Sequence, residues 1–278
     1  MIGITGASGF IGSHICRHFK LLGVDFIPLD IRSRGRNYID VRDYGSVERS
    51  LGDCDAVIHL AALIDARESS SRWKDYYETN ITGTFNVAKF CRDNGMNMVF
   101  ASSAAVYGAP QARATESTPA NPLNFYGYTK WIGEELIRKL LDRYVILRLS
   151  NVYGPECHGL VRVLTERDGI VINGDGNQKR DFVYIDDVVS AFQAAVSTDF
   201  SGTLNIGSGK SITVNEAVGI AENIFGKSYA KTFRETNEVK LEYDFVVEKA
   251  KSALGWAPRY SFREGLKKMI FSTPQNLQ

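Results

Sequence analysis

Tyr126 and Lys130 are the two side chains whose types and spacing most directly suggest a reaction. They lie four residues apart in the segment YGYTK, so on a helix both project from one face, whereas Tyr128 points elsewhere. A free tyrosine has a pKa of about 10, but a neighbouring ammonium group and a positively charged nicotinamide ring stabilise its phenolate. Such a pair can remove the proton of an alcohol while hydride leaves the same carbon.

Ser103 is a third polar side chain that belongs with this pair. It ends the apolar segment NMVFASS, which has the composition of a buried strand. In open α/β sheets, ligands bind at the carboxyl ends of the strands, so the Ser103 hydroxyl can hold the same substrate oxygen as Tyr126.

Three glycines near the start of the chain, Gly6, Gly9 and Gly12, indicate where a cofactor binds. The order strand, GxxGxxG and helix puts backbone amides at the positively polarised start of a helix, with no side chain in the way of a pyrophosphate. The spacing differs by one residue from the more common GxGxxG. The alternative is a tight turn without a ligand.

Asp30 bears on the choice of cofactor. It ends the next predicted strand, 18 residues after Gly12, where a carboxylate can accept hydrogen bonds from ribose hydroxyls and repel a 2′-phosphate. This favours NAD over NADP. Arg32, Arg34 and Arg36 could each pair with such a phosphate, so NADP stays possible, although we interpret these arginines as a solvated loop.

The elements that must position these residues alternate along the first half of the chain. Strands are predicted at 1–5, 25–30, 55–62, 97–103 and 144–150, with helices between them, including one at 128–142. This alternation predicts an α/β fold, a Rossmann-type doubly wound parallel sheet. We expect residues 1–150 to form an NAD-binding domain and 151–278 a smaller α/β substrate domain, with part of 181–207 packing back on the first.

Charge and cysteine content narrow the class of protein. The 278 residues carry 33 basic and 32 acidic side chains, a net charge of +1, which offers no basic surface for nucleic acid or for a membrane. The four cysteines form no CxxC pair, so neither a metal site nor a disulfide framework is expected. We find no signal peptide and no apolar run near the roughly 20 residues of a membrane span, which predicts a cytoplasmic protein.

The chain resembles a known family from end to end. It is similar to the extended short-chain dehydrogenases/reductases of the NAD-dependent nucleotide-sugar epimerase/dehydratase group. The matching motifs are TGASGFIGSH (5–14), DVRD (40–43), HLAA (59–62), ETNITGT (78–84), SSAAVYG (102–108), YGYTK (126–130), NVYGP (151–155), GDGNQKRDFVYIDD (174–187), NIGSGK (205–210) and KSALGW (251–256). Their order and spacing together make the resemblance highly specific.

The resemblance implies a role for each matching site residue. Ser103, Tyr126 and Lys130 correspond to the catalytic triad, with Tyr126 and Lys130 also at the nicotinamide and its ribose. The remaining cofactor-binding positions are Gly6, Gly9, Phe10, Ile11, Gly12, Asp30, Asp40, Val41, Leu60, Ala61, Ala62 and Asn80. Asp40 and Val41 would contact the adenine, and Asn80 would steady the site near the nicotinamide.

Substrate residues are implied in the same way. Asn151 and Arg180 correspond to positions that hold a nucleotide-diphosphate sugar, and Arg180 can bind two diphosphate oxygens. Arg234 corresponds to a second diphosphate arginine, ten residues before Asp244, although Glu235 and Thr236 replace the usual proline and glycine. Leu241 then falls where UDP-galactose 4-epimerases gate the substituent on carbon 2, and a leucine leaves room for N-acetylated sugars.

Ala104 and Ala105 decide between the reactions of the family. Relatives that eliminate water or decarboxylate place acidic side chains here, and GDP-fucose synthase relatives carry a cysteine in place of Ala105. Alanines transfer no protons, which favours a nucleotide-sugar 4-epimerase that oxidises the sugar transiently at carbon 4, on a UDP-hexose or a UDP-N-acetylhexosamine. The alternatives are an NAD(P)H-dependent 4-ketoreductase and, from another class, a non-catalytic NAD-sensing or partner-binding module.

Several other features are interpreted as structural. We expect His59 to be packed in its strand, His158 to be a loop residue, Asp186 and Asp187 to cap a helix at 188–196, and Tyr76 and Tyr77 to be core. The helices at 83–95 and after Tyr126 carry apolar faces, which in the family pack against their copies, so a homodimer is expected.

Overall fold

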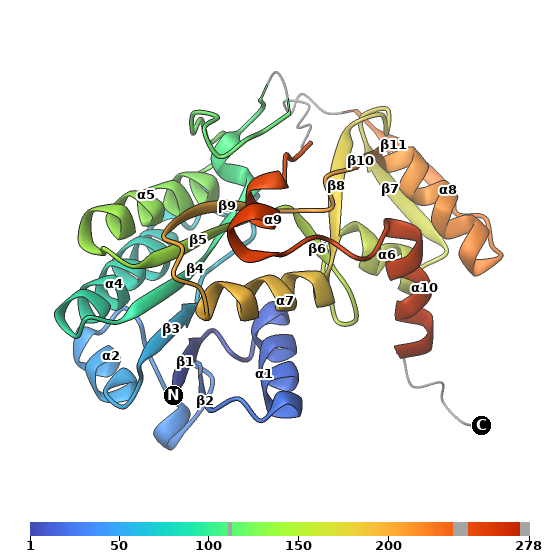
Figure 1. The fold of residues 1–278 in the computed structure, drawn as a ribbon. Helices are drawn as coiled ribbons and strands as arrows, with labels where there is room; N and C mark the ends of the chain where they lie inside the picture. Colours follow the sequence, from blue (N-terminus) through green and yellow to red (C-terminus); the bar gives the residue numbers. More distant parts are fainter. Residues whose placement is uncertain (111–112, 236–243, 273–278) are drawn as a thin grey trace.

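Six parallel strands form the central sheet of the computed structural model, which describes residues 1–110, 113–235 and 244–272 (Figure 1). The strand order is β2-β1-β3-β4-β5-β9. The bounds are β1 Ile2–Thr5, β2 Phe26–Leu29, β3 Ala56–His59, β4 Asn97–Ser103, β5 Tyr144–Leu149 and β9 Gly202–Ile206. This confirms the predicted doubly wound sheet. β3 ends earlier than expected, so Leu60–Ala62 leave the sheet.

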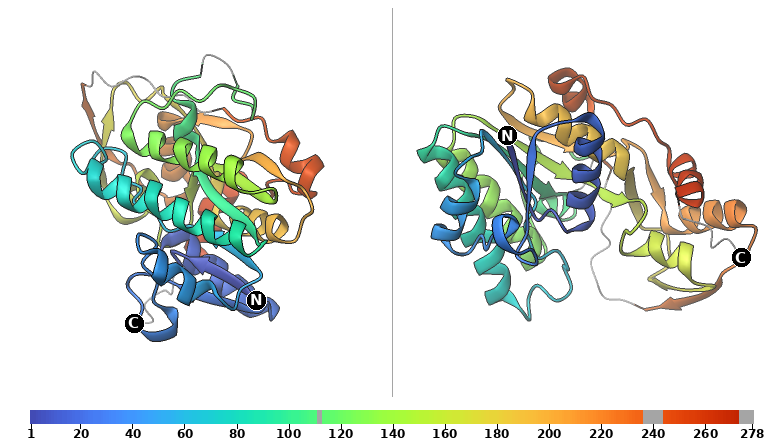
Figure 2. Two further views of the ribbon diagram at one scale, coloured as in Figure 1. Left: turned by 90° about the vertical axis from the view of Figure 1, so that its left-hand side faces the viewer. Right: turned by 90° about the horizontal axis from the view of Figure 1, so that it is seen from below.

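Helices cover both faces of this sheet (Figure 2). On one face lie α1 (Phe10–Leu22) and α7 (Ile185–Val196), and on the other α2 (Tyr44–Leu51), α4 (Gly83–Asp93) and α5 (Phe125–Leu140). Two separate buried clusters fill the two interfaces, one including Phe19 and Phe192 and the other including Val87 and Ile137. Burial of these side chains is the main force that holds the layers together.

The chain leaves the sheet after β5 and returns to it at β9. Residues Val145–Leu149 of β5 pair in parallel with Gly202–Ile206 of β9, and α7, which precedes β9, packs against β3, β4 and β5. The segment between β5 and α7 builds a second group of strands beside the main sheet. The main sheet is therefore completed by residues far along the sequence.

Two small sheets lie on the side of the molecule that faces the carboxyl ends of the main strands (Figure 1). The first has the order β10-β8-β6, and the second pairs β11 with β7. Their bounds are β6 Asn151–Tyr153, β7 Gly169–Asn173, β8 Lys179–Tyr184, β10 Ser211–Thr213 and β11 Ala230–Arg234. Around them are α6 Leu160–Glu166, α8 Val214–Phe225, α9 Glu248–Leu254 and α10 Phe262–Ser272.

Short helical segments complete the fold near the strand ends. They are η1 (Gly35–Asn37), α3 (Trp73–Tyr76), the π-helical turn η2 (Tyr77–Thr82) and η3 (Ala104–Tyr107). Of the two tyrosines expected in the core, Tyr76 is fully buried but Tyr77 is half exposed, so the prediction for Tyr77 was wrong. Among the described residues, no helix has both the length and the apolar character needed to cross a bilayer.

Candidate active site

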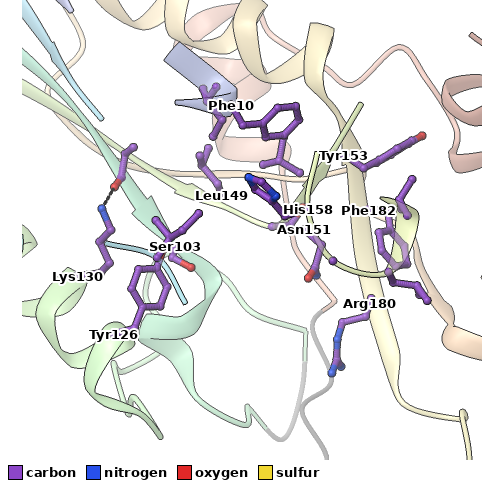
Figure 3. Close-up of a pocket in the computed structure, with 18 of the residues that line it drawn as sticks. Phe10, Ser103, Tyr126, Lys130, Leu149, Asn151, Tyr153, His158, Arg180 and Phe182 are labelled. Atoms are coloured by element: carbon purple, nitrogen blue, oxygen red, sulfur yellow. Dashed lines mark hydrogen bonds between the residues drawn. The ribbon is translucent and has the colours of Figure 1, made fainter. Parts of the chain in front are cut away.

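A cavity of about 890 Å³ opens between the carboxyl ends of the main strands and the small sheets (Figure 3). It contains residues from the glycine loop, from the ends of β4 and β5, from β6, and from the loop and helix that follow β6. Of the predicted site residues, those that line it are Gly6, Gly9, Phe10, Ile11, Gly12, Leu60, Ala62, Ser103, Tyr126, Lys130, Asn151 and Arg180. The fold thus brings residues from distant motifs to one place.

The glycine loop requires glycine at positions 6 and 12, because a side chain at either position would clash with the backbone. Gly6 has φ +71°, and a Cβ there would lie 2.7 Å from the backbone nitrogen of Ala61. A Cβ on Gly12 would lie 2.3 Å from the carbonyl oxygen of Gly6. Gly9 is the N-cap of α1, so the free amides at the start of that helix meet the cavity. The loop therefore combines close backbone packing with a site suited to a phosphate.

A second cavity of about 460 Å³ adjoins the first on the other side of the glycine loop. The two share Gly6, Gly9, Leu60 and Ala62 as lining residues. The predicted residues Asp30, Asp40, Val41 and Ala61 line this second cavity. The two cavities therefore meet at the glycine loop.

Asp30 has fixed hydrogen bonds at the end of β2. Its carboxylate accepts from the backbone N–H of Ser8 at 3.0 Å and from the backbone and Nε of Arg32 at 3.0 and 3.2 Å. Burial alone would raise the pKa of Asp30, but these hydrogen bonds outweigh it and lower the pKa below the usual value. Arg32 pairs with Asp30 and lines the second cavity, and its side chain is 65% exposed, in agreement with its interpretation as part of a solvated loop.

Ser103, Tyr126 and Lys130 meet at the wall of the larger cavity (Figure 3). Helix α5 begins at Phe125, capped by Asn124, so Tyr126 and Lys130 do lie one turn apart on it. The Ser103 side chain, at the end of β4, lies near that of Tyr126, and both line the cavity. Burial raises the pKa of Tyr126, and the contact with Ser103 partly opposes this.

Lys130 is 4% exposed, and its Nζ donates to the carbonyl oxygen of Ala101 at 2.8 Å. Burial lowers the pKa of its ammonium group to about 8, while the charge of Glu134 acts in the opposite direction. The protein therefore holds the cation of the triad in a buried position, where water screens its charge little.

A buried ion pair fixes α5 against the sheet behind the triad. Glu134 is fully buried and accepts from Nε and Nη2 of Arg148 on β5, at 2.9 and 2.6 Å. It also accepts from Ser102 Oγ at 2.5 Å and from Arg138 at 2.6 Å. Burial alone would raise the pKa of Glu134, but the Arg148 hydrogen bonds and charge lower it overall. This network fixes the helix that carries Tyr126 and Lys130.

Asn80 lies outside both cavities. It is 2% exposed on the π-helical turn η2, accepts from the backbone N–H of Leu63 at 2.8 Å, and donates to the carbonyl oxygen of Leu63 and to Thr129 Oγ1. It therefore joins the loop after β3 to α5. From this position Asn80 can steady the site through its hydrogen bonds, but it lines neither cavity.

The predicted substrate residues are only partly brought together. Asn151 lies at the start of β6, where its side chain donates to the carbonyl oxygen of Asp181, and Arg180 lies on β8, and both line the cavity. Arg234 is exposed on β11, opposite the cavity residue Asn173 in the strand register, and does not line the cavity itself. Leu241 lies outside the described residues.

Two further expectations are decided by the packing. His59 is fully buried in β3, with Nδ1 2.7 Å from Thr5 Oγ1, as predicted for a packed residue. Asp186 and Asp187 do not cap α7, whose N-cap is Tyr184. Instead Asp186 accepts from Lys268 at 2.7 Å, and Asp187 accepts from the backbone N–H of Tyr260 at 3.1 Å. These partners come from the end of the chain, which local spacing does not reveal.

For His158 the sequence predicted a loop residue rather than a ligand. It lies in a loop, as expected, but it also lines the larger cavity, together with Leu149, Tyr153, Phe182 and others. The signal in the sequence was its place three residues after the end of NVYGP, a motif that already supplies Asn151. In the described part of the chain, no cluster of three His, Cys, Asp or Glu side chains could hold a metal ion.

The parallel sheet, the glycine loop before α1 and the Ser–Tyr–Lys grouping define a Rossmann-type short-chain dehydrogenase/reductase. The family model described as the NAD dependent epimerase/dehydratase family matches residues 2–207, and the chain belongs to this family. This confirms the family resemblance found in the sequence.

Individual relatives resemble the chain over nearly its whole length. A Methanocaldococcus jannaschii protein, provisionally named as a UDP-glucose 4-epimerase, is 35% identical over 298 residues and 97% of each chain. The structure of MoeE5 in complex with UDP-glucose and NAD has a TM-score of 0.89 and 31% identity, covering 97% of each chain. The Thermotoga maritima UDP-glucose 4-epimerase with UDP-glucose has a TM-score of 0.89 and 30% identity, with the same coverage. The names of the Methanocaldococcus jannaschii and Thermotoga maritima relatives agree with the predicted 4-epimerase.

Proposed function

We propose that this protein is an NAD-dependent nucleotide-sugar 4-epimerase whose substrate is a UDP-hexose or a UDP-N-acetylhexosamine. The observation that carries the proposal is the meeting of Ser103, Tyr126 and Lys130 in a cavity that is continuous with the space around the glycine loop. UDP-glucose is bound in the similar structures of MoeE5 and of the Thermotoga maritima enzyme.

The residues around the glycine loop fit NAD. Gly6, Gly9 and Gly12 leave the start of α1 open to a pyrophosphate, and Asp30 offers a carboxylate to the adenosine ribose. Asp40 and Val41 line the second cavity, where the adenine would lie. When bound, NAD supplies reversible hydride acceptance at carbon 4 of the sugar.

The chain's own residues supply the acid–base chemistry. Tyr126 takes the proton of the 4-hydroxyl group and later returns it, while Ser103 hydrogen-bonds the same oxygen. Lys130, which lines the same cavity, is assigned to stabilise the phenolate form of Tyr126 by its charge. After oxidation the 4-keto sugar turns over in the cavity and is reduced on its other face, so no cofactor is consumed overall.

The neighbourhood of Ser103 supports epimerisation over elimination. Ala104 and Ala105 form the start of η3, directly after Ser103, and neither can transfer a proton. Arg180 and Asn151 on the opposite wall are suited to the diphosphate and the sugar. We retain Arg234 as a second diphosphate residue because it is paired in register with Asn173, which lines the cavity.

Three broader features are part of the proposal. The sheet residues 1–150, completed by α7 and β9, form the NAD-binding unit, and most of 151–278 forms the nucleotide-sugar unit. Exposed aromatic side chains on α4 and α5, such as Phe85 and Tyr128, support a homodimer through these helices, which analytical ultracentrifugation tests. The four free cysteines fit a reducing compartment such as the cytoplasm.

The experiment that tests the activity is incubation of the protein with a panel of UDP, GDP and dTDP sugars, with and without NAD(P)H. An epimerase interconverts the 4-epimers without added reductant and retains NAD on purification, detectable by mass spectrometry. Turnover only of 4-keto sugars with consumption of NAD(P)H establishes the 4-ketoreductase instead. Tyr126→Phe removes the proton acceptor and should lower turnover by about 10²- to 10⁴-fold with the fold and NAD binding intact. Substantial turnover by this variant contradicts the mechanism.

A further inference from the structure

The loop between β6 and α6, residues 154–159, is held in an unusual conformation at the edge of the larger cavity. Glu156 has φ +67° and is the one non-glycine residue with a positive φ among those described, and Gly159 follows with φ +77°. A left-handed glutamate persists only where surrounding contacts impose it, and such strain often accompanies a functional site. The two left-handed residues flank Cys157 and His158.

Contacts from the first helix hold this loop in place. His14 Nε2, on α1, donates to the carbonyl oxygen of Pro155 at 3.1 Å, and the His14 ring packs edge-on against Phe10, 5.4 Å between centroids. Arg17, one turn further on, pairs with Glu156 at 3.3 Å. The Cys157 side chain is buried, and its backbone N–H donates to the carbonyl oxygen of Gly154 at 3.1 Å. The same helix therefore forms the cofactor end of the site and fixes the loop.

The next residue, His158, is presented by this anchored loop. Its side chain is exposed and lines the larger cavity, and no described residue hydrogen-bonds to it. In the view of Figure 3 the imidazole lies between the wall with Ser103 and Tyr126 and the wall with Arg180 and Phe182. This is the interval that a sugar occupies when its 4-hydroxyl meets Tyr126 and its diphosphate meets Arg180.

We propose that His158 is a specificity-determining residue of the sugar subsite, where its imidazole hydrogen-bonds a hydroxyl group of a neutral hexose. The inference rests on the proposed function, since that function places a sugar between Tyr126 and Arg180. An imidazole carries both a donor and an acceptor, which matches a hydroxyl group well.

The charges around the cavity favour a neutral sugar over a hexuronate. Among the described lining residues, the basic side chains are Lys130, Arg180 and His158, and Asp175 adds a negative charge at the rim. Lys130 donates to the carbonyl oxygen of Ala101 and belongs to the triad, and we assign Arg180 to the diphosphate. Among these described lining residues, a sugar carboxylate would thus have only an imidazole as a cationic partner, whereas the hydroxyl groups of a hexose need no permanent cation.

The test measures binding of UDP-glucose, UDP-glucuronate and UDP to the NAD-loaded protein by isothermal titration calorimetry, together with kcat and KM for both sugars. We expect the wild type to prefer UDP-glucose. His158→Leu should weaken UDP-glucose binding by about 10-fold, the value of a lost hydrogen bond, and leave the Kd of UDP unchanged. The effect should lie in KM more than in kcat, and His158→Asn, which retains a donor and an acceptor, should restore most of the affinity.

The matched control is His18→Leu. His18 is a histidine on α1 that hydrogen-bonds Gln193 and does not line the cavity, so the same replacement there should not change UDP-glucose affinity. Equal weakening of UDP and UDP-glucose by His158→Leu, no weakening of either, or a wild-type preference for UDP-glucuronate overturns the proposal. A wild type that binds UDP-glucose but does not epimerise it contradicts the proposed function and leaves the binding result for His158 standing.

Discussion

The ammonium group of Lys130 is hydrogen-bonded at 2.8 Å to the carbonyl oxygen of Ala101, two residues before Ser103 on the same strand. The contact ties the helix that carries Tyr126 to the strand whose end carries Ser103. It also leaves Lys130 as a buried cation, which is costly unless the charge is used. We infer that the fold bears this cost because catalysis needs the charge.

Lys130→Met removes the charge and keeps a side chain of similar length. We expect kcat to fall by about 100-fold or more, because the phenolate of Tyr126 loses its stabilising cation. The temperature of unfolding should not fall, since a buried charge is replaced by an apolar group. Steady-state kinetics and thermal unfolding of the same preparation check both points. A variant within about 3-fold of wild-type kcat would show that the ammonium group is not needed.

Asp30→Ser tests how the protein selects its cofactor. The replacement removes the carboxylate that repels a 2′-phosphate. In the wild type, Arg32 donates to that carboxylate at 3.2 Å, so the replacement also frees the Arg32 side chain. We expect the ratio of NADPH to NADH affinity to rise by about 10- to 100-fold, equivalent to roughly 1.4–2.8 kcal/mol. Fluorescence titration with both reduced cofactors measures the ratio. The double variant Asp30→Ser, Arg32→Ser is the control, and it should lose the gain for NADPH.

Glu134→Gln tests the buried ion pair behind the triad. Arg148 is almost fully buried and would keep its charge without a compensating carboxylate, so unfolding free energy should drop by about 3–5 kcal/mol. Urea denaturation of wild type and variant gives this difference. Glu135→Gln, a change at an exposed neighbour on the same helix, serves as the control and should cost less than about 1 kcal/mol. Equal losses of unfolding free energy in the two variants would mean that burial of the ion pair does not determine its contribution to stability.

His59 gives the stability of the protein a defined pH dependence. Burial, with the charge of Lys130 as a second cause, lowers its pKa from 6.5 to about 3, so it is neutral in the folded protein. The unfolded chain binds a proton below pH 6.5, and stability is therefore lost as the pH falls from 6.5 toward 3. Between pH 7 and pH 5 the loss from this residue is about 2 kcal/mol. Denaturant unfolding of the wild type and of His59→Gln at both pH values isolates this contribution. The variant should lack the loss of unfolding free energy that His59 causes.

Much of the site could be predicted because its signals are local. The glycine loop is a strand, a turn and the start of a helix within a dozen residues, and Tyr126 and Lys130 are one helical turn apart. Ser103 could be placed near these two residues because strand ends in parallel sheets meet at one edge. These relationships hold whatever the rest of the chain does.

Other features depend on contacts between distant segments and could not be predicted in this way. The orientation of His158 depends on a left-handed Glu156 and on His14 from the first helix. The acids at the start of α7 look like caps, but Asp186 is paired with Lys268 from the last described helix. Local propensity shows which partners are possible, and only the packing decides among them.

The late return of the chain to the main sheet has a consequence for its synthesis. β5 leaves the ribosome well before β9, and until β9 pairs with it, β5 is an open edge strand with apolar side chains such as Val145 and Leu147. A nascent chain at this stage can pair with other chains through that edge. A fragment that stops at residue 150 would keep the glycine loop and the triad, yet it would aggregate, because the strand that protects its edge is encoded about fifty residues further on.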